Sequence, residues 1–371
     1  MSLRMINSVY ANRSIDSHCA LCGRPFASAA SNMEHIFPKW LQHQHNLWNK
    51  RLTLPNFIGR TYKGVKIRVC EKCNNVRFGQ LESKLSALFK NADSYEALQQ
   101  VSDGDLGVWL GKISWLLCRV SHAQEDFRTR AQVIPEQVVP GELIPGTYYL
   151  GILERAFAMK KQMLSCYADD PPALSSYSAP YSLYRFLIDT RDTRFEPFDF
   201  ADNLFVLGTA FRSGNTGLIC LFDGGLHRRF RAHRFASLSS KALHPMQFNE
   251  VVGRMFYDQT VVEQNAQAVI YFWNPLLKAV IAMTRWPRFA DPYIQENNDL
   301  KRYASFIGRH TFSDPAGVVT NDGEVFTVLW DENEQFMPYA VSDEEVARAL
   351  RNPRRRAVGP TASKWRQQPP E

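Results

Sequence analysis

The first half of the chain carries apolar residues at the spacing of buried helix faces. The clearest stretch has them at positions i, i+4, i+7 and i+8, occupied by Leu81, Leu85, Leu88 and Phe89. The polar segment 91–94 predicts a break and the N-cap of a new helix. Further helices are predicted over about residues 106–123 and, after a connector at 133–146 rich in proline and glycine, up to about residue 167.

From Tyr181 onward the pattern changes to short runs of aromatic and β-branched residues, which are typical of strands. Five such runs are predicted as strands: 181–189, 203–211, 217–225, 267–273 and 324–330. A helix is predicted among them over 248–264. Helices followed by strands favour the α+β class for this part of the chain.

We expect three parts along the chain. Every metal-ligand signal falls within residues 17–77, so the first domain is assigned to 1–92. A larger α+β domain of unknown type is assigned to 93–346. The basic tail, 347–371, is expected to be disordered, and residues 1–16 are expected to form an arm or a first helix.

Charge is distributed unevenly along the chain, and this distribution indicates the kind of partner that the protein binds. The net charge is +7, but residues 1–90 hold 14 Lys and Arg against 4 Asp and Glu, and the tail holds 7 against 1. The central part is therefore acidic. A basic module beside an acidic body favours a polyanion, and above all DNA, bound at the N-terminal end.

The apolar runs of the sequence indicate neither a membrane protein nor a secreted protein. No run approaches the roughly 20 residues that a membrane helix needs. The first residues contain no apolar segment of a secretory signal. A cytoplasmic location is therefore expected, with no membrane partner.

Seven cysteines are present, and four of them form two C-x-x-C pairs. The pairs are Cys19 with Cys22, and Cys70 with Cys73. A C-x-x-C turn brings two sulfur atoms close enough to share a tetrahedral ion, so the two pairs predict a structural Zn²⁺ with four thiolate ligands. The other three, Cys118, Cys166 and Cys220, lie in apolar surroundings and are expected to be buried free thiols.

The residues between and after these pairs carry the candidate chemistry. Glu34-His35 is followed by Ile-Phe-Pro, and the second cysteine pair is followed at once by Asn74 and Asn75. The combination EHIFPKWL and CEKCNNVRFGQLE resembles the cysteine-bearing branch of the HNH endonuclease family. The resemblance covers about residues 15–83, under a quarter of the chain.

The resemblance implies a ββα-metal fold, in which two strands and a helix hold one divalent ion. It implies His35 as the general base, Glu34 as a metal ligand, and Asn74 as the ligand at the start of the helix, with Asn75 as an alternative. Oxygen ligands suit a catalytic Mg²⁺ or Mn²⁺. For the asparagine that braces the loop, Asn56 is favoured over Asn46 and Asn49. His43 and His45 are expected to be exposed loop residues.

The resulting functional prediction is a metal-dependent endonuclease that hydrolyses DNA phosphodiester bonds, by nicking or by double-strand cleavage. Resemblance further associates such modules with anti-phage defence or restriction, where the C-terminal domain would contact other proteins of the system. The alternatives are a non-catalytic, zinc-stabilised DNA-binding adaptor and an RNase that uses the same site. In the body, Asp223 and His227 are interpreted as part of a turn that ends a strand.

Overall fold

The computed structural model describes twelve segments of the chain. They are residues 17–21, 25–54, 59–91, 93–122, 181–203, 208–223, 225–265, 269–274, 279–284, 300–311, 318–319 and 327–339. The expectations for 1–16, for the connector and helix between 133 and 167, and for the tail lie outside these residues.

The N-terminal elements are short strands and helices built around one antiparallel pair. Strand β1 (Ser31–His35) pairs with β4 (Lys66–Cys70), with Glu34 opposite Ile67 and His35 opposite Lys66. The remaining elements are η1 (Phe26–Ser28), α2 (Lys39–Gln44), β2 (Arg51–Thr53), β3 (Gly59–Thr61), η2 (Tyr62–Gly64), the π-helical segment η3 (Lys72–Phe78) and α3 (Gly79–Phe89). Two paired strands that lead into a helix are thus present.

A five-stranded sheet forms the centre of the body. Its strands are β5 (Ser182–Ile188), β6 (Phe198–Asn203), β7 (Gly208–Ser213), β8 (Thr216–Leu221) and β9 (Ala242–Leu243). They lie in the order β6-β7-β8-β5-β9, antiparallel except for the β5–β9 pair. A separate pair joins β10 (Val269–Asn274) to β11 (Ala279–Thr284).

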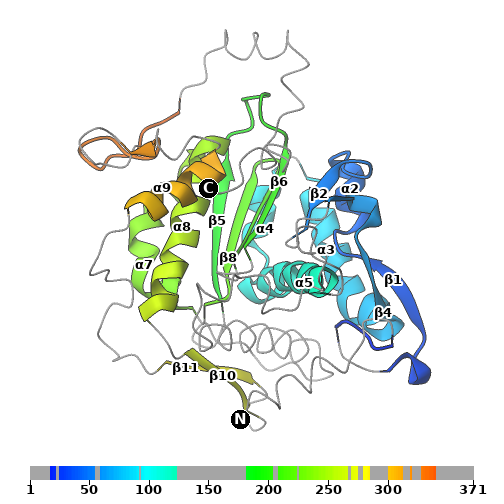
Figure 1. Ribbon diagram of the computed structural model, residues 1–371. Helices are drawn as coiled ribbons and strands as arrows, with labels where there is room; N and C mark the ends of the chain where they lie inside the picture. The colour runs from blue at the N-terminus through cyan, green and yellow to red at the C-terminus, as the bar shows by residue number, and fades with distance from the viewer. Residues whose placement is uncertain are drawn as a thin grey trace, which may run out of the picture.

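Helices cover both faces of this sheet (Figure 1). Helices α7 (Leu226–Ala236), α8 (Pro245–Asn265) and α9 (Leu300–Thr311) lie on one side, and α4 (Ser94–Gln99), α5 (Asp103–His122) and the N-terminal elements lie on the other. Alternation along the strands explains the two layers, because successive side chains point to opposite faces. In β8, Leu218 and Cys220 join the core on the N-terminal side, whereas Ile219 and Leu221 pack with α7 and α8.

Three of the predicted helices are confirmed, and two strand predictions are wrong over the residues that the structure describes. Helices α3, α5 and α8 lie where the periodicity predicts them. The run 203–211 is not one strand: β6 ends at Asn203 and β7 begins at Gly208. Residues 327–330 form no strand, and Trp330 makes only an isolated bridge with Phe336. No described helix is long and apolar enough to cross a membrane.

One hydrophobic core continues across the predicted boundary at residue 92. Trp109 of α5 is fully buried and stacks on Trp40. Its ring also packs at a tilt beside Phe89 and meets Phe211 of β7 edge-on at 5.2 Å. The indole N–H of Trp115 donates to the Ala20 carbonyl at 2.9 Å. Helix α5 therefore joins the N-terminal elements to the sheet. The boundary itself stays a prediction of the sequence.

Polar contacts join the same two parts. The His45 imidazole hydrogen-bonds Ser213 Oγ at 2.8 Å, and Lys50 pairs with Glu196 at 2.9 Å. His43 is exposed, as expected. The expectation for His45 is wrong, because it is 7% exposed and packs beside Phe198. Burial and the nearby Lys50 and Arg212 charges lower its pKa to about 4, so it is neutral at pH 7.

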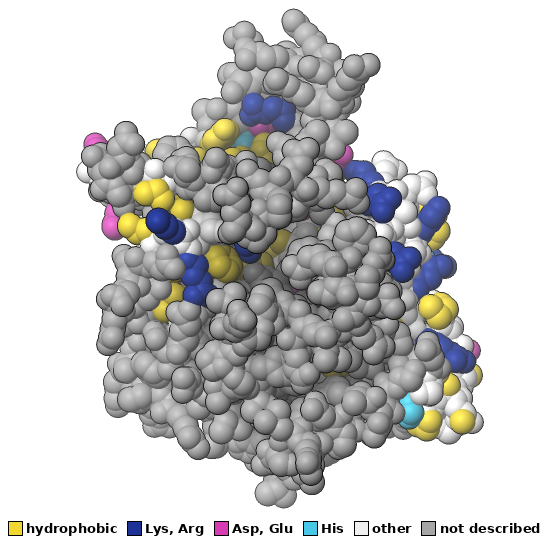
Figure 2. All heavy atoms as spheres, in the orientation of Figure 1, with side chains coloured by type: hydrophobic (Ala, Val, Ile, Leu, Met, Phe, Trp, Pro, Cys, Tyr) yellow, Lys and Arg dark blue, Asp and Glu magenta, His cyan; other side chains and the backbone are white. Residues whose placement is uncertain are grey.

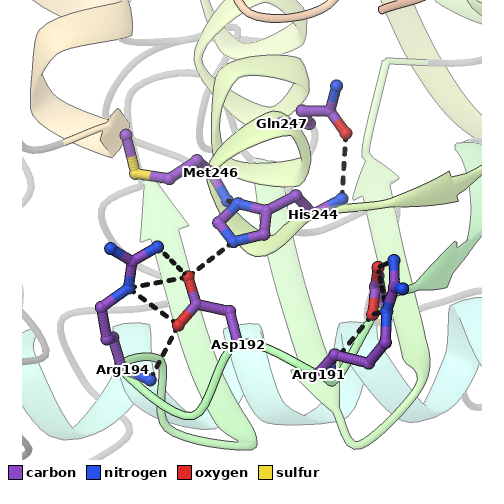
Figure 3. Close-up of polar contacts among 7 residues, drawn as sticks. Arg191, Asp192, Arg194, His244, Met246 and Gln247 are labelled. Carbon is purple, nitrogen blue, oxygen red and sulfur yellow. Dashed lines mark hydrogen bonds and ion pairs between the residues drawn. The ribbon is translucent and has the colours of Figure 1, made fainter. Parts of the chain in front are cut away.

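A buried histidine holds the start of α8 (Figure 3). His244 Nδ1 accepts the backbone N–H of Met246 at 3.2 Å, and its Nε2 donates to Asp192 at 2.9 Å. The same carboxylate receives the Arg194 guanidinium. Both ring nitrogens are thus engaged and the side chain is fully buried. These contacts stabilise the fold and leave no ring nitrogen for catalysis.

The shared core leads to a stability prediction for Trp109. Trp109→Ala should lower the free energy of unfolding by about 3–5 kcal/mol, since a large buried side chain leaves a cavity. Because its ring contacts both parts, the N-terminal elements and the sheet should unfold in one calorimetric transition at a lower temperature. Val76→Ala is the control, because Val76 is 59% exposed. Two separate transitions in the wild type would contradict the single core.

Candidate metal centre and catalytic site

Three cysteines meet where the loop at residues 17–21, β4 and η3 come together. The ligand atoms of Cys19, Cys70 and Cys73 all lie within 4.8 Å of one another, and all three residues are buried. None of the three is in a disulfide. Within the described ranges this is the one group of three or more cysteine, histidine or carboxylate side chains close enough together to hold a metal ion.

The chemistry of this cluster fits a thiophilic ion such as Zn²⁺. The backbone N–H of Cys70 donates to Cys19 Sγ at 3.2 Å, which favours the negative charge of a thiolate. Backbone bonds from Ala20 to Arg68 and from Glu71 to Ala30 fix the loop against the two strands. Cys22, the fourth predicted ligand, lies outside the described residues. A buried three-cysteine site for a metal is therefore present, with the fourth ligand still a prediction.

The end of β1 carries two chemically different side chains on its two faces. Glu34 and His35 are adjacent in an extended strand, so they point to opposite sides. His35 lies beside Trp48, with ring centroids 5.4 Å apart, and Gln42 of α2. Glu34 instead reaches Lys112 of α5. Glu34 is therefore no direct partner of His35, although the two are neighbours in the sequence.

His35 is neutral at pH 7 because of its surroundings. It is 6% exposed, and burial together with the charges of Lys66 and Lys39 lowers its pKa to about 4. The Gln42 amide nitrogen donates to the Phe37 carbonyl at 2.7 Å and approaches His35 Nδ1 at 3.3 Å. Nδ1 is thus held as the proton-accepting nitrogen, and its contact with Gln42 is long.

A fully buried ammonium binds Glu34. Lys112 Nζ lies 2.5 Å from Glu34 Oε1 and 2.6 Å from Glu82 Oε1 of α3. Burial lowers the pKa of Lys112, but the Glu82 and Glu34 carboxylates outweigh it and raise the pKa above the usual lysine range. The lysine is therefore charged, and it ties β1, α3 and α5 together.

The start of the helix brings one of the two candidate asparagines toward β1. Asn74 Nδ2 donates to Asn32 Oδ1 at 3.0 Å, and Asn32 shares a strand face with Glu34 because they are two residues apart. Asn75 is exposed, which favours Asn74 as the ligand. Asn56 lies outside the described residues, Asn49 accepts a bond from Lys63, and Asn46 adopts φ +53° after α2.

The oxygen donors of Glu34 and Asn74 fit a hard divalent ion by type and by the face they share. The Lys112 ammonium, however, already binds Glu34 Oε1. Glu82 and Lys112 are functional candidates that sequence reasoning missed. A signal for Lys112 existed: it is the one charged residue within the apolar run from Val108 to Leu117, and a charge in such a run needs a buried partner.

Exposed basic side chains lie over the N-terminal elements (Figure 2). They include Lys39, Arg51, Arg60, Lys63, Lys66, Arg68 and Lys72. Lys39 and Lys66 are also the two cations whose charge acts on His35. A surface of this sign beside the candidate base suits an approaching phosphate backbone.

The polar residues at the Asp-Gly-Gly turn of the body have structural partners. Asp223 accepts the backbone N–H groups of Gly225 and His227 and so caps α7. The His227 ring lies between Tyr184, at 2.8 Å, and Asp258, at 3.2 Å, and is fully buried. This agrees with the interpretation as a turn after a strand.

No family model, no curated protein and no solved structure matches this chain.

The cysteine cluster predicts a tightly held metal. Purified protein should contain about one zinc per chain, and Cys70→Ser should lose it, because a thiolate ligand and its place beside Cys19 are removed. Inductively coupled plasma mass spectrometry measures the metal. Cys220→Ala is the matched control: that cysteine is also fully buried, but burial raises the pKa of its thiol and it belongs to β8. Wild-type protein free of thiophilic metal would contradict the assignment.

Proposed function

We propose that this chain is a divalent-ion-dependent endonuclease of the HNH type, which hydrolyses phosphodiester bonds of DNA. The observation that carries the proposal is the end of β1. One face of the strand bears the neutral, nearly buried imidazole of His35. The opposite face bears the Glu34 carboxylate, on the side of the helix that begins beside the cysteine cluster.

Each residue has a definite part in the proposed reaction. His35 Nδ1 accepts a proton from a water molecule, whose oxygen attacks phosphorus while one P–O ester bond breaks. A divalent ion held by Glu34 and Asn74 would polarise the phosphate and stabilise the leaving oxygen. Gln42 orients the imidazole and must yield Nδ1 to the water, which its long 3.3 Å contact favours.

Electrostatics supports a polyanionic substrate. The exposed lysines and arginines around β1 to β4 offer positive charge for several phosphates, and acidic residues are few among the first 90. Burial and, after it, the positive charges of Lys66 and Lys39 lower the pKa of His35, so the base is unprotonated before substrate arrives. Neutralisation of Lys39 and Lys66 by a bound phosphate raises the basicity of His35 where it is needed.

The decisive variant is His35→Ala. It should reduce the nicking rate of supercoiled plasmid with Mg²⁺ or Mn²⁺ by about 10²- to 10⁴-fold, which is the usual contribution of a general base. Gel separation of supercoiled, nicked and linear DNA measures the rate. Zinc content and DNA binding should remain close to wild type, since the base acts in the transition state.

His233→Ala is the control, because His233 is exposed on α7, in the body. A His35→Ala protein that nicks at the wild-type rate would falsify the assignment of the base. Wild-type protein that binds plasmid without cutting it supports the adaptor instead. Cleavage of RNA alone, in a parallel assay, supports the RNase.

A further inference from the structure

The Glu34 carboxylate contacts a cation of the same chain, the Lys112 ammonium. Lys112 comes from α5, outside the segment that resembles the HNH family, and none of its side chain is exposed. Its Nζ contacts Glu34 Oε1 and Glu82 Oε1 at 2.5 and 2.6 Å, and lies 5.2 Å from the Phe78 ring centroid. Two carboxylates and one ammonium leave a net charge of −1.

This arrangement has the features of a cation site that is already filled. Glu34 and Glu82 come from different elements, β1 and α3, and both aim one oxygen at the same point. Glu34 is almost buried, so water cannot screen the pair effectively. A divalent ion brought to Glu34 Oε1 while Lys112 stays in place would meet strong repulsion at short range.

We propose that Lys112 is a resident cation that competes with a divalent metal ion for Glu34, so that the ion binds there only when the ammonium leaves. The role of the ion in catalysis rests on the proposed function, but the competition between the ion and Lys112 is measured without DNA. While Lys112 contacts Glu34, the divalent-ion site is closed, and movement of α5 or of the Lys112 side chain opens it.

The test is Mn²⁺ binding to zinc-loaded full-length protein, followed by electron paramagnetic resonance of the free ion. Lys112→Met keeps an unbranched side chain that is one atom shorter, and it removes the charge. It should bind Mn²⁺ about tenfold more tightly than wild type, or better, because two carboxylates then face no cation. Its melting temperature should be low without Mn²⁺ and should rise when Mn²⁺ is added.

Lys84→Met is the matched control. Lys84 also joins α3 to α5 through an ion pair, with Asp105 at 2.9 Å, but half of its side chain is exposed. Its Mn²⁺ affinity should equal that of the wild type. In Lys112→Met/Glu34→Gln the gain in affinity should disappear, which assigns the ion to Glu34.

A second variant guards against simple misfolding. Lys112→Met/Glu82→Gln relieves the repulsion between the carboxylates and keeps Glu34 for the ion. Equal Mn²⁺ affinity in wild type and in both Lys112 variants overturns the proposal. So does failure of both to fold even in excess Mn²⁺, because a site open to the ion would be rescued by it.

The two proposals can fail separately. Tighter Mn²⁺ binding in Lys112→Met, together with wild-type nicking in His35→Ala, keeps the resident cation and removes the nuclease assignment of His35. Nicking that depends on His35, without any gain of Mn²⁺ affinity in the Lys112 variants, keeps the nuclease and removes the competition.

Discussion

A buried charge must have partners, and this requirement organises the N-terminal half of the molecule. Lys112 is fully buried, so its ammonium needs the carboxylates of Glu34 and Glu82. Removal of one partner from a buried ion pair typically costs about 3–5 kcal/mol. Meeting the requirement fixes β1, α3 and α5 relative to one another, and it joins a carboxylate of the candidate site to α5.

The cysteine cluster and the ion triad of Lys112, Glu34 and Glu82 lie at the two ends of β1. Both also fix the helical segment that follows β4. The cluster fixes the start of η3 against the loop that carries Cys19, while Lys112 fixes α3 through contacts between nitrogen and oxygen atoms. Soft sulfur and hard oxygen donors are thus kept apart. The cysteine group is suited to a thiophilic metal ion, while the Lys112 ammonium lies between the two carboxylates.

The central sheet explains why the module and the body share a core. Its two faces are both apolar, so each needs a cover: α7 and α8 on one face, and α5 with the N-terminal elements on the other. The module therefore buries one side against β6 and β7, and its basic residues remain on the exposed side.

The sequence by itself determined the local and chemical features. Periodicity predicted α3, α5 and α8, because helices depend on neighbours along the chain. Each C-x-x-C spacing is also local, and the presence of two such pairs predicted a shared metal. It also singled out Glu34 and His35. Only the tertiary structure decided what these two residues touch. The Lys112–Glu34 contact joins residues 78 positions apart, and the burial of His45 depends on Ser213 in the sheet. Such contacts follow from packing of whole elements, which no local pattern contains.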